Sequence, residues 1–105
     1  MFSGYQEFKD QQYAKALPKL QIVAEAGNAE AQSMVGCIYQ VGFGQVGVDM
    51  PKAIAWYERA SAQGHGLASN NLAGIRCMEG NVAEGRRLYQ LARAQGFEHI
   101  PAGMA

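Results

Sequence analysis

The chain has 105 residues, 49% hydrophobic and 17% charged, a globular balance that excludes intrinsic disorder. Its nine basic residues offset nine acidic ones, so we expect no nucleic-acid partner. The longest apolar run, Val35 to Tyr39, is far below the roughly 20 residues that a membrane span needs, and the first 15 residues lack the apolar stretch of a signal peptide, which leaves the compartment open between cytoplasm and periplasm.

Apolar residues recur along the chain at the spacing of amphipathic helices. Pro51 stands where a first helical turn tolerates proline, and Gly27 and Gly64 stand where helices end in a left-handed residue. Pro18 lies inside a helical pattern and predicts a kink. We expect helices over residues 2–9, 12–26, 29–41, 51–63, 67–78 and 82–95.

The sequence also repeats itself. The segment from Trp56 to Gly64 recurs 32 residues later, from Leu88 to Gly96, and the segment around Gly36 recurs around Gly74. A weaker copy precedes both. We therefore predict an all-α fold, a short α/α superhelix of about three antiparallel helix pairs. It forms one domain over residues 1–105, with units of about 1–27, 28–64 and 65–96 and a tail over 97–105.

One stretch of the second unit resembles the Sel-one-like repeat, a short-repeat relative of the tetratricopeptide repeats. The resemblance is carried by Ala29 to Gln32, Val35 to Tyr39, Gly42, Gly44, Gly47 to Asp49, Lys52-Ala53, Trp56-Tyr57 and Ala60 to Gly64. It implies a right-handed superhelix of helix pairs. It also implies an adaptor, signalling scaffold or surface or periplasmic interaction protein of bacteria, and no reaction.

The third unit departs from this pattern. Gly85 replaces the alanine found at Ala53, Arg76-Cys77 replaces Ile38-Tyr39, and the glycine-rich loop is short. We interpret the last helix pair as a degenerate closing repeat.

Other motifs do not indicate an enzyme. The glycines from Gly42 to Gly47 match the dinucleotide fingerprint by letters, but a helix precedes them where that fingerprint needs a strand, so we interpret them as a turn. Cys37 and Cys77 lie too far apart for a metal-binding pair and are expected to be reduced structural thiols. His65, in the turn between units, is expected to be solvated. We expect no catalytic residue, metal or cofactor.

The first helix of each pair provides a candidate protein-binding surface. A tetratricopeptide-like superhelix would line up on its concave side a set of aromatic, aliphatic and amide groups suited to a peptide or a partner helix. The alternative is that these residues only contact the neighbouring first helix, and the sequence favours neither. The set comprises Tyr5, Phe8, Glu30, Ser33, Cys37, Gln40, Asn71, Ile75 and Met78.

The remaining aromatic residues and glycines are expected to pack the helices together. Tyr39, Trp56, Tyr57 and Tyr89 fall at core positions of the pairs, and Gly36 and Gly74 at positions of close helix approach.

A second function class is a structural or oligomerising module, which could be a piece of a longer repeat protein. Neither Met1-Phe2 nor the segment from Phe97 to Ala105, with Ile100 and Pro101, resembles the polar cap that repeat stacks need. A homodimer through exposed terminal helices would cover such ends.

Overall fold

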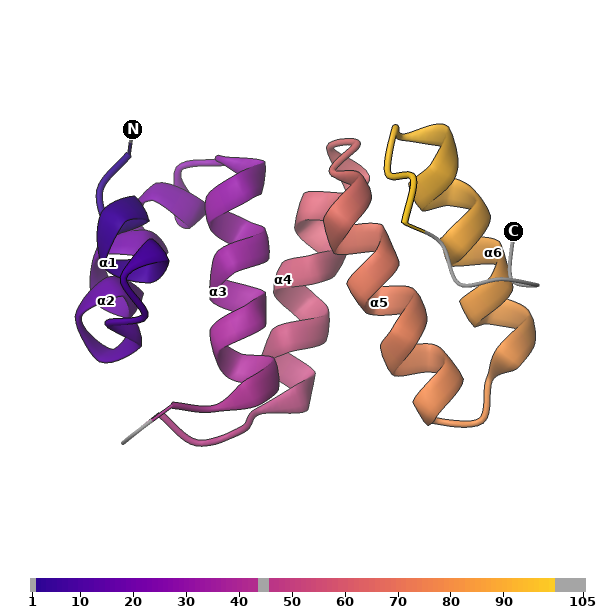
Figure 1. Cartoon of the computed structure of the whole chain (residues 1–105), viewed down its shortest axis with the longest axis horizontal. Coiled ribbons are helices and arrows are strands. Elements are labelled where there is room, and N and C mark those ends of the chain that lie inside the picture. Colours follow the sequence, from indigo (N-terminus) through magenta and orange to yellow (C-terminus); the bar gives the residue numbers. More distant parts are fainter. Residues whose placement is uncertain (1, 44–45, 100–105) are drawn as a thin grey trace.

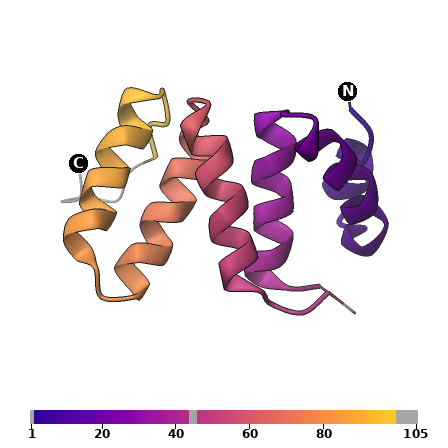
Figure 2. The ribbon, with the colours of Figure 1, turned by 180° about the vertical axis from the view of Figure 1, so that it is seen from behind.

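A computed structural model describes residues 2–43 and 46–99 of the chain, and it shows helices packed one after another in a row (Figure 1). Each helix contacts the next one along the sequence. Viewed from behind, α4 comes forward between α3 and α5 (Figure 2). The prediction of an all-α short solenoid is confirmed. The helices of the described part are α1 Tyr5–Lys9, α2 Tyr13–Glu25, α3 Ala29–Val41, α4 Met50–Ala62, α5 Gly66–Met78 and α6 Val82–Ala94.

The expected bounds are confirmed to within one residue for α2 to α6, but the expected start of α1 at residue 2 is wrong. Gly4 has φ +89°, a left-handed conformation, and α1 begins only after it. A Cβ at Gly4 would lie 2.8 Å from Cγ of Leu20, so the chain turns where it rests on α2. Within α2 the helix continues through Pro18.

Four helices begin with the same side-chain cap. The Asn28 and Asn81 side chains cap α3 and α6, and Asp49 caps α4, each accepting a bond from the backbone N–H three residues later. In α5 the cap is His65, whose Nδ1 accepts from the Ala68 N–H at 3.2 Å. The expectation that His65 is merely solvated is therefore wrong: the side chain is half-buried and begins a helix.

Two clusters of buried side chains form the core. One joins α2 and α3 through Leu20, Val35 and Ile38, and the other joins α4, α5 and α6 around Tyr57 and Tyr89. Tyr39 and Trp56 are half-buried, and Tyr39 packs against both clusters. The expected framework of aromatic side chains is thus confirmed.

The two repeated glycines differ in how closely the next helix approaches. A Cβ at Gly36 would lie 2.8 Å from Cε1 of Tyr57, so α3 and α4 meet ring against backbone, as expected. Gly74 lies one position later in its helix than Gly36 does, because Ala73 is the eighth residue of α5 as Gly36 is of α3. At Gly74 the nearest atom is the Tyr89 hydroxyl oxygen at 3.7 Å, an ordinary contact. Close packing is confirmed at Gly36 and is looser at Gly74.

The outward side of α6, the last helix of the described part, is polar. Arg86, Gln90 and Arg93 are all exposed along it. In the repeat register Arg86 stands where α4 has Ile54, and Arg93 where it has Ser61. Charged side chains thus replace residues that dock the next helix. Ile100 and Pro101 lie outside the described residues.

Candidate protein-binding face

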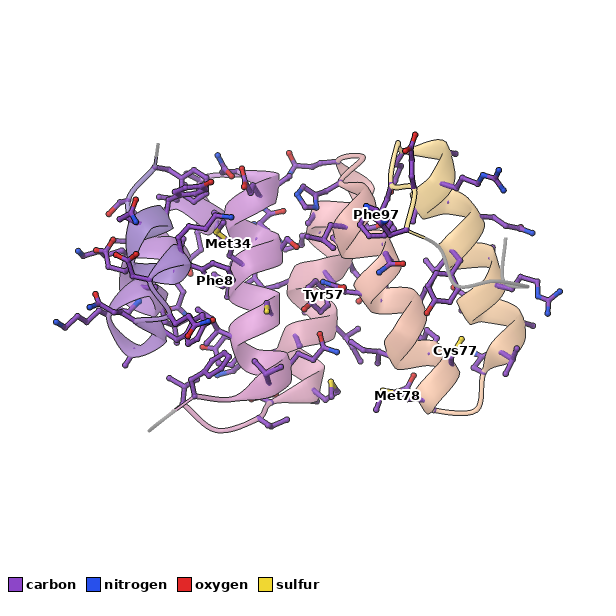
Figure 3. All side chains as sticks on the ribbon, viewed as in Figure 1. Phe8, Met34, Tyr57, Cys77, Met78 and Phe97 are labelled. Atoms are coloured by element: carbon purple, nitrogen blue, oxygen red, sulfur yellow. The ribbon has the colours of Figure 1, made fainter. Side chains whose placement is uncertain are left out.

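Side chains from three helices meet between α3 and α5. Tyr57 belongs to α4, yet its ring lies between α3 and α5 (Figure 3). Its hydroxyl donates to Oε1 of Gln40 at 2.7 Å, while Cys37 on α3 and Asn71 on α5 also lie close enough to alter its ionisation. We call Cys37, Gln40, Tyr57 and Asn71 the α3–α5 polar cluster.

The electrostatics of this cluster suit recognition more than reaction. Burial raises the pKa of the Tyr57 hydroxyl well above its ordinary value, the Cys37 thiol raises it further, and the Asn71 side chain opposes the shift. Burial also raises the pKa of the Cys37 thiol, which keeps it protonated and weakly nucleophilic near neutral pH. What the cluster offers is amide donors and acceptors: Gln40 and Asn71 are only half-buried.

The structure brings together some of the nine predicted surface residues and buries others. Cys37, Gln40 and Asn71 meet in the α3–α5 polar cluster, whereas Met78 lies at the end of α5 with 81% of its surface exposed. Ser33 and Ile75 are only 4% and 2% exposed. These two side chains are buried within the chain, so neither can anchor a partner in this conformation.

The other predicted residues lie around α1 and the start of α3. The Tyr5 ring packs edge-on against Phe2, and the Phe8 ring packs edge-on against Tyr13, with centroids 5.3 and 5.4 Å apart. Both Tyr5 and Phe8 are half-buried, and Glu30 is exposed. No hydrogen bond in the described part joins these residues to the Tyr57 hydroxyl or to Gln40, which bond to each other.

A buried set of polar contacts between units was not foreseen. Gln32 donates to the Ala24 carbonyl and accepts from Gln63, both at 3.0 Å. In the next unit, Gln95 makes the corresponding contacts: it donates to the Ser61 carbonyl at 3.1 Å and accepts from the Ser69 hydroxyl. Glutamine at the repeated Ala-Gln-Gly ending was a usable signal, since Gln63 and Gln95 are register equivalents.

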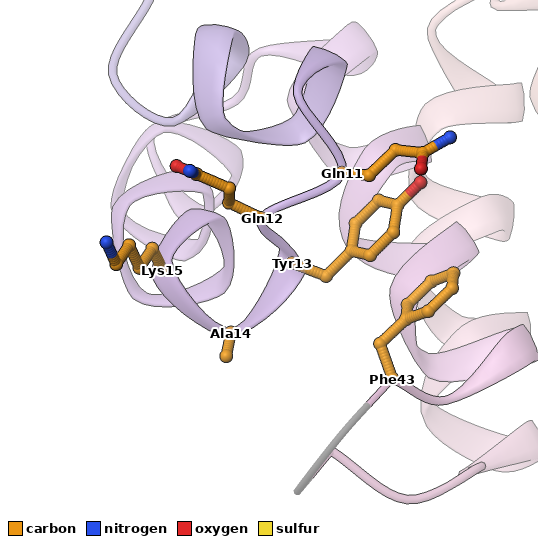
Figure 4. A pocket seen from close by; sticks show the side chains of 6 residues that line it. All are labelled: Gln11, Gln12, Tyr13, Ala14, Lys15 and Phe43. Atoms are coloured by element: carbon orange, nitrogen blue, oxygen red, sulfur yellow. The ribbon is translucent and has the colours of Figure 1, made fainter.

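A cavity of about 520 Å³ opens beside the start of α2 (Figure 4). The Tyr13 and Phe43 rings stack at its wall, with centroids 3.6 Å apart and planes 19° from parallel. The neighbouring Gly44 and Gln45, part of the expected glycine turn, lie outside the described residues. Sequence patterns do not indicate this cavity, because Tyr13 and Phe43, which form its wall, are 30 residues apart in the chain. Its lining residues are Gln11, Gln12, Tyr13, Ala14, Lys15 and Phe43.

The described part contains neither a metal-ligand cluster nor a membrane-spanning helix. No group of three His, Cys, Asp or Glu side chains gathers within residues 2–43 and 46–99, and Cys37 and Cys77 are free thiols there. Over the same ranges, every helix is too short and too polar to span a lipid bilayer.

Comparison with known proteins agrees with the repeat register. The model of the Sel1 repeat matches residues 29–65 and again residues 66–97. A search of curated proteins finds no match. Sel1 repeats generally mediate protein–protein interaction. With two matched repeats over more than half of its length, and with paired helices at both, the chain belongs to the Sel1 repeat family.

Proposed function

We propose that the chain is a non-enzymatic scaffold that binds a peptide or partner protein along the face formed by α1, α3 and α5. The observation that carries this proposal is the α3–α5 polar cluster, in which Gln40 and Asn71 are half-buried beside the Tyr57 hydroxyl. Each amide can donate to and accept from a partner's backbone, which fixes register. The exposed Met78 adds a flexible apolar contact nearby on α5.

The same chemistry supports a non-enzymatic role. Acyl transfer would need a thiolate and a neighbouring base, whereas burial keeps the Cys37 thiol protonated. The neighbours that share its site are a tyrosine hydroxyl and carboxamides, none of which is basic near neutral pH.

A peptide selected by display on the intact chain provides the test. We expect each of Asn71→Ala, Gln40→Ala and Met78→Ala to weaken binding of this peptide about 30-fold, which corresponds to about 2 kcal/mol. Tyr57→Phe keeps the ring on Gly36 but releases the Gln40 amide, so it is expected to change affinity more than stability. Gln90→Ala, exposed on α6, is the control. Full affinity in the first variants with loss in the control would refute the face assignment.

The second candidate function is self-association through the terminal helices. A two-fold interface places the same patch on both copies, so pairing through α6 would oppose Arg86 and Arg93 to their own equivalents. The α2 end is favoured instead, because Ile22 is 73% exposed there. Light scattering of the intact chain and of Ile22→Glu distinguishes the two functions: a dimer that Ile22→Glu separates supports self-association.

A further inference from the structure

The two grooves between successive units are filled differently. In the first groove, Trp56 of α4 packs against the α2–α3 cluster, and the Arg59 guanidinium lies 4.5 Å from the centre of its indole ring. In the second groove the register equivalents are Leu88 and Leu91 on α6. The later unit thus has two leucines where the earlier one has an indole and a cation.

A hollow of about 450 Å³ lies where those larger side chains are missing. Leu72 of α5 and Leu88 of α6 are buried at its base, and Leu91 is half-buried beside them. In the view from behind, α4 and α6 lie on either side of α5 (Figure 2). The residues that line the hollow include no member of the α3–α5 polar cluster, so the two sites are separate. Its lining comprises Glu58, Ser61, Ala62, Gly64, Leu72, Arg87, Leu88, Leu91 and Gln95.

The rim of the hollow carries a negative charge that attracts a cation. Glu58 is exposed, and no ion pair engages it among residues 2–43 and 46–99. Arg87, on the opposite rim, is held by Glu84 through two hydrogen bonds of 2.9 and 2.6 Å. Its charge is thereby largely offset, so the remaining rim charge is the Glu58 carboxylate.

We propose that this hollow binds an aromatic side chain of indole size, with a cationic group beside it, from a partner protein. The chain itself shows the fit, because Trp56 and Arg59 make that combination at the equivalent place of the preceding groove. The apolar base accepts the ring, and Glu58 attracts the cation. This site does not depend on the proposed α1, α3 and α5 face.

The test titrates the intact chain with tryptamine, an indole that carries an ammonium group, and follows backbone amide signals by NMR. We expect saturable shifts at Leu72, Leu88 and Leu91. Indole-3-propionate, which carries a carboxylate, is expected to bind about two- to fivefold more weakly, and added salt should shrink that difference. Shifts absent at these leucines, or equal affinity for both probes, would overturn the proposal.

Two variants separate the ring from the charge. Leu88→Trp fills the hollow with the residue of the preceding groove and is expected to weaken tryptamine binding at least about tenfold. Glu58→Gln removes the rim charge and introduces glutamine, the residue that α2 has at Gln21, the position equivalent to Glu58. In this variant, tryptamine and indole-3-propionate should bind with similar affinity. Glu58 is exposed, so this variant is expected to fold even if Leu88→Trp does not. If folded Glu58→Gln bound tryptamine as tightly as the unaltered chain, the role of the Glu58 charge would be overturned. If folded Leu88→Trp did so, the site itself would be overturned.

Discussion

The contact of the Tyr57 ring with Gly36 ties the packing of the chain to its candidate binding face. The ring is fully buried and its hydroxyl is held by Gln40, so it has little freedom to move away from α3. Glycine in a helix costs about 1 kcal/mol relative to alanine, and at Gly36 the close approach of the ring offsets that cost. At Gly74, where Tyr89 stands farther off, nothing comparable does.

Alanine at Gly36 and alanine at Gly74 should therefore have opposite effects. Gly36→Ala pushes a methyl group into the Tyr57 ring and is expected to lower the free energy of unfolding by about 1–3 kcal/mol. Gly74→Ala meets only ordinary contact and is expected to raise it by up to about 1 kcal/mol through helix propensity. Urea denaturation of both variants checks this, and equal midpoints would show that ring contact does not distinguish the two sites.

Ser69 and Asn70 show how side-chain length changes the bonding at repeated positions. Counted from the caps Asn28 and His65, Ser69 stands where the preceding unit has Gln32. Gln32 bonds to the Ala24 carbonyl and to Gln63, whereas the shorter Ser69 bonds to Gln95, and Gln95 itself bonds to the Ser61 carbonyl. The next residue, Asn70, has a buried Oδ1 without a hydrogen-bond partner in the described part. The repeat pattern predicts which positions face the neighbouring unit, and side-chain length then decides which partner is reached.

Helix beginnings are the elements whose chemistry differs most between units. Asn28 and His65 hold the same cap position, and only the histidine titrates near neutral pH. Burial lowers the pKa of His65 below 6.5, while the nearby Glu30 carboxylate partly opposes the shift. The neutral imidazole is therefore favoured by folding, since its Nδ1 must keep a lone pair for the Ala68 N–H.

The stability of α5 is accordingly expected to depend on pH. Because the folded-state pKa lies below the unfolded one, the cap's contribution is complete above about pH 6.5 and is lost as the pH falls through the folded value. Loss of the cap should lower the free energy of unfolding by about 1 kcal/mol.

His65→Asn, which copies the cap of α3, keeps an acceptor that does not titrate. This variant should not show the decrease that begins as the pH falls below about 6.5. Glu7 and Glu84, whose pKa values are lowered from 4.5 by Lys19 and Arg87, titrate at lower pH than that onset. Denaturation of both proteins at several pH values measures the effect, and parallel profiles would contradict the role of His65.

The sequence could predict the helices well and the candidate site only in part, for physical reasons. Gly27, Gly64 and the apolar spacing act over a few residues, so they place helix ends without knowledge of the fold. The predicted start of α1 was wrong because Gly4 packs closely against Leu20 of α2, a tertiary contact that local sequence patterns do not reveal. Likewise, helical spacing identifies Tyr57 as a core residue but does not reveal that its hydroxyl reaches Gln40 on another helix.

In the third unit the two helices of the pair approach closely at one glycine. Gly85 of α6 stands where α4 of the second unit has Ala53. A Cβ at Gly85 would lie only 2.3 Å from Sγ of Cys77, so the glycine leaves room for the thiol. The third unit is therefore a closely packed helix pair whose last helix, α6, carries charge on its outward face in place of docking residues.

That outward face provides a test of how the row of helices ends. The Ser61 hydroxyl on α4 bonds to the Ser69 hydroxyl on α5 at 2.6 Å. Ile54 of α4 packs against the buried cluster that joins α4, α5 and α6, so both residues help to dock the next unit. Arg86 and Arg93 hold the equivalent places on α6 and are exposed. Restoring the docking residues with Arg86→Ile and Arg93→Ser should uncover an attractive surface for another helix.

We expect this double variant to self-associate more strongly than the unaltered chain, because an apolar and a small side chain replace two arginines that repel their equivalents in a second copy. Sedimentation or light scattering over a range of concentrations measures the change in average mass. Lys52→Ile combined with Arg59→Ser is the matched control, since it removes the same charge from exposed positions on α4, away from both end helices. A larger mass in the α6 variant alone supports arginine as the cap, whereas equal masses in the two variants would show that net charge, not the α6 face, governs association.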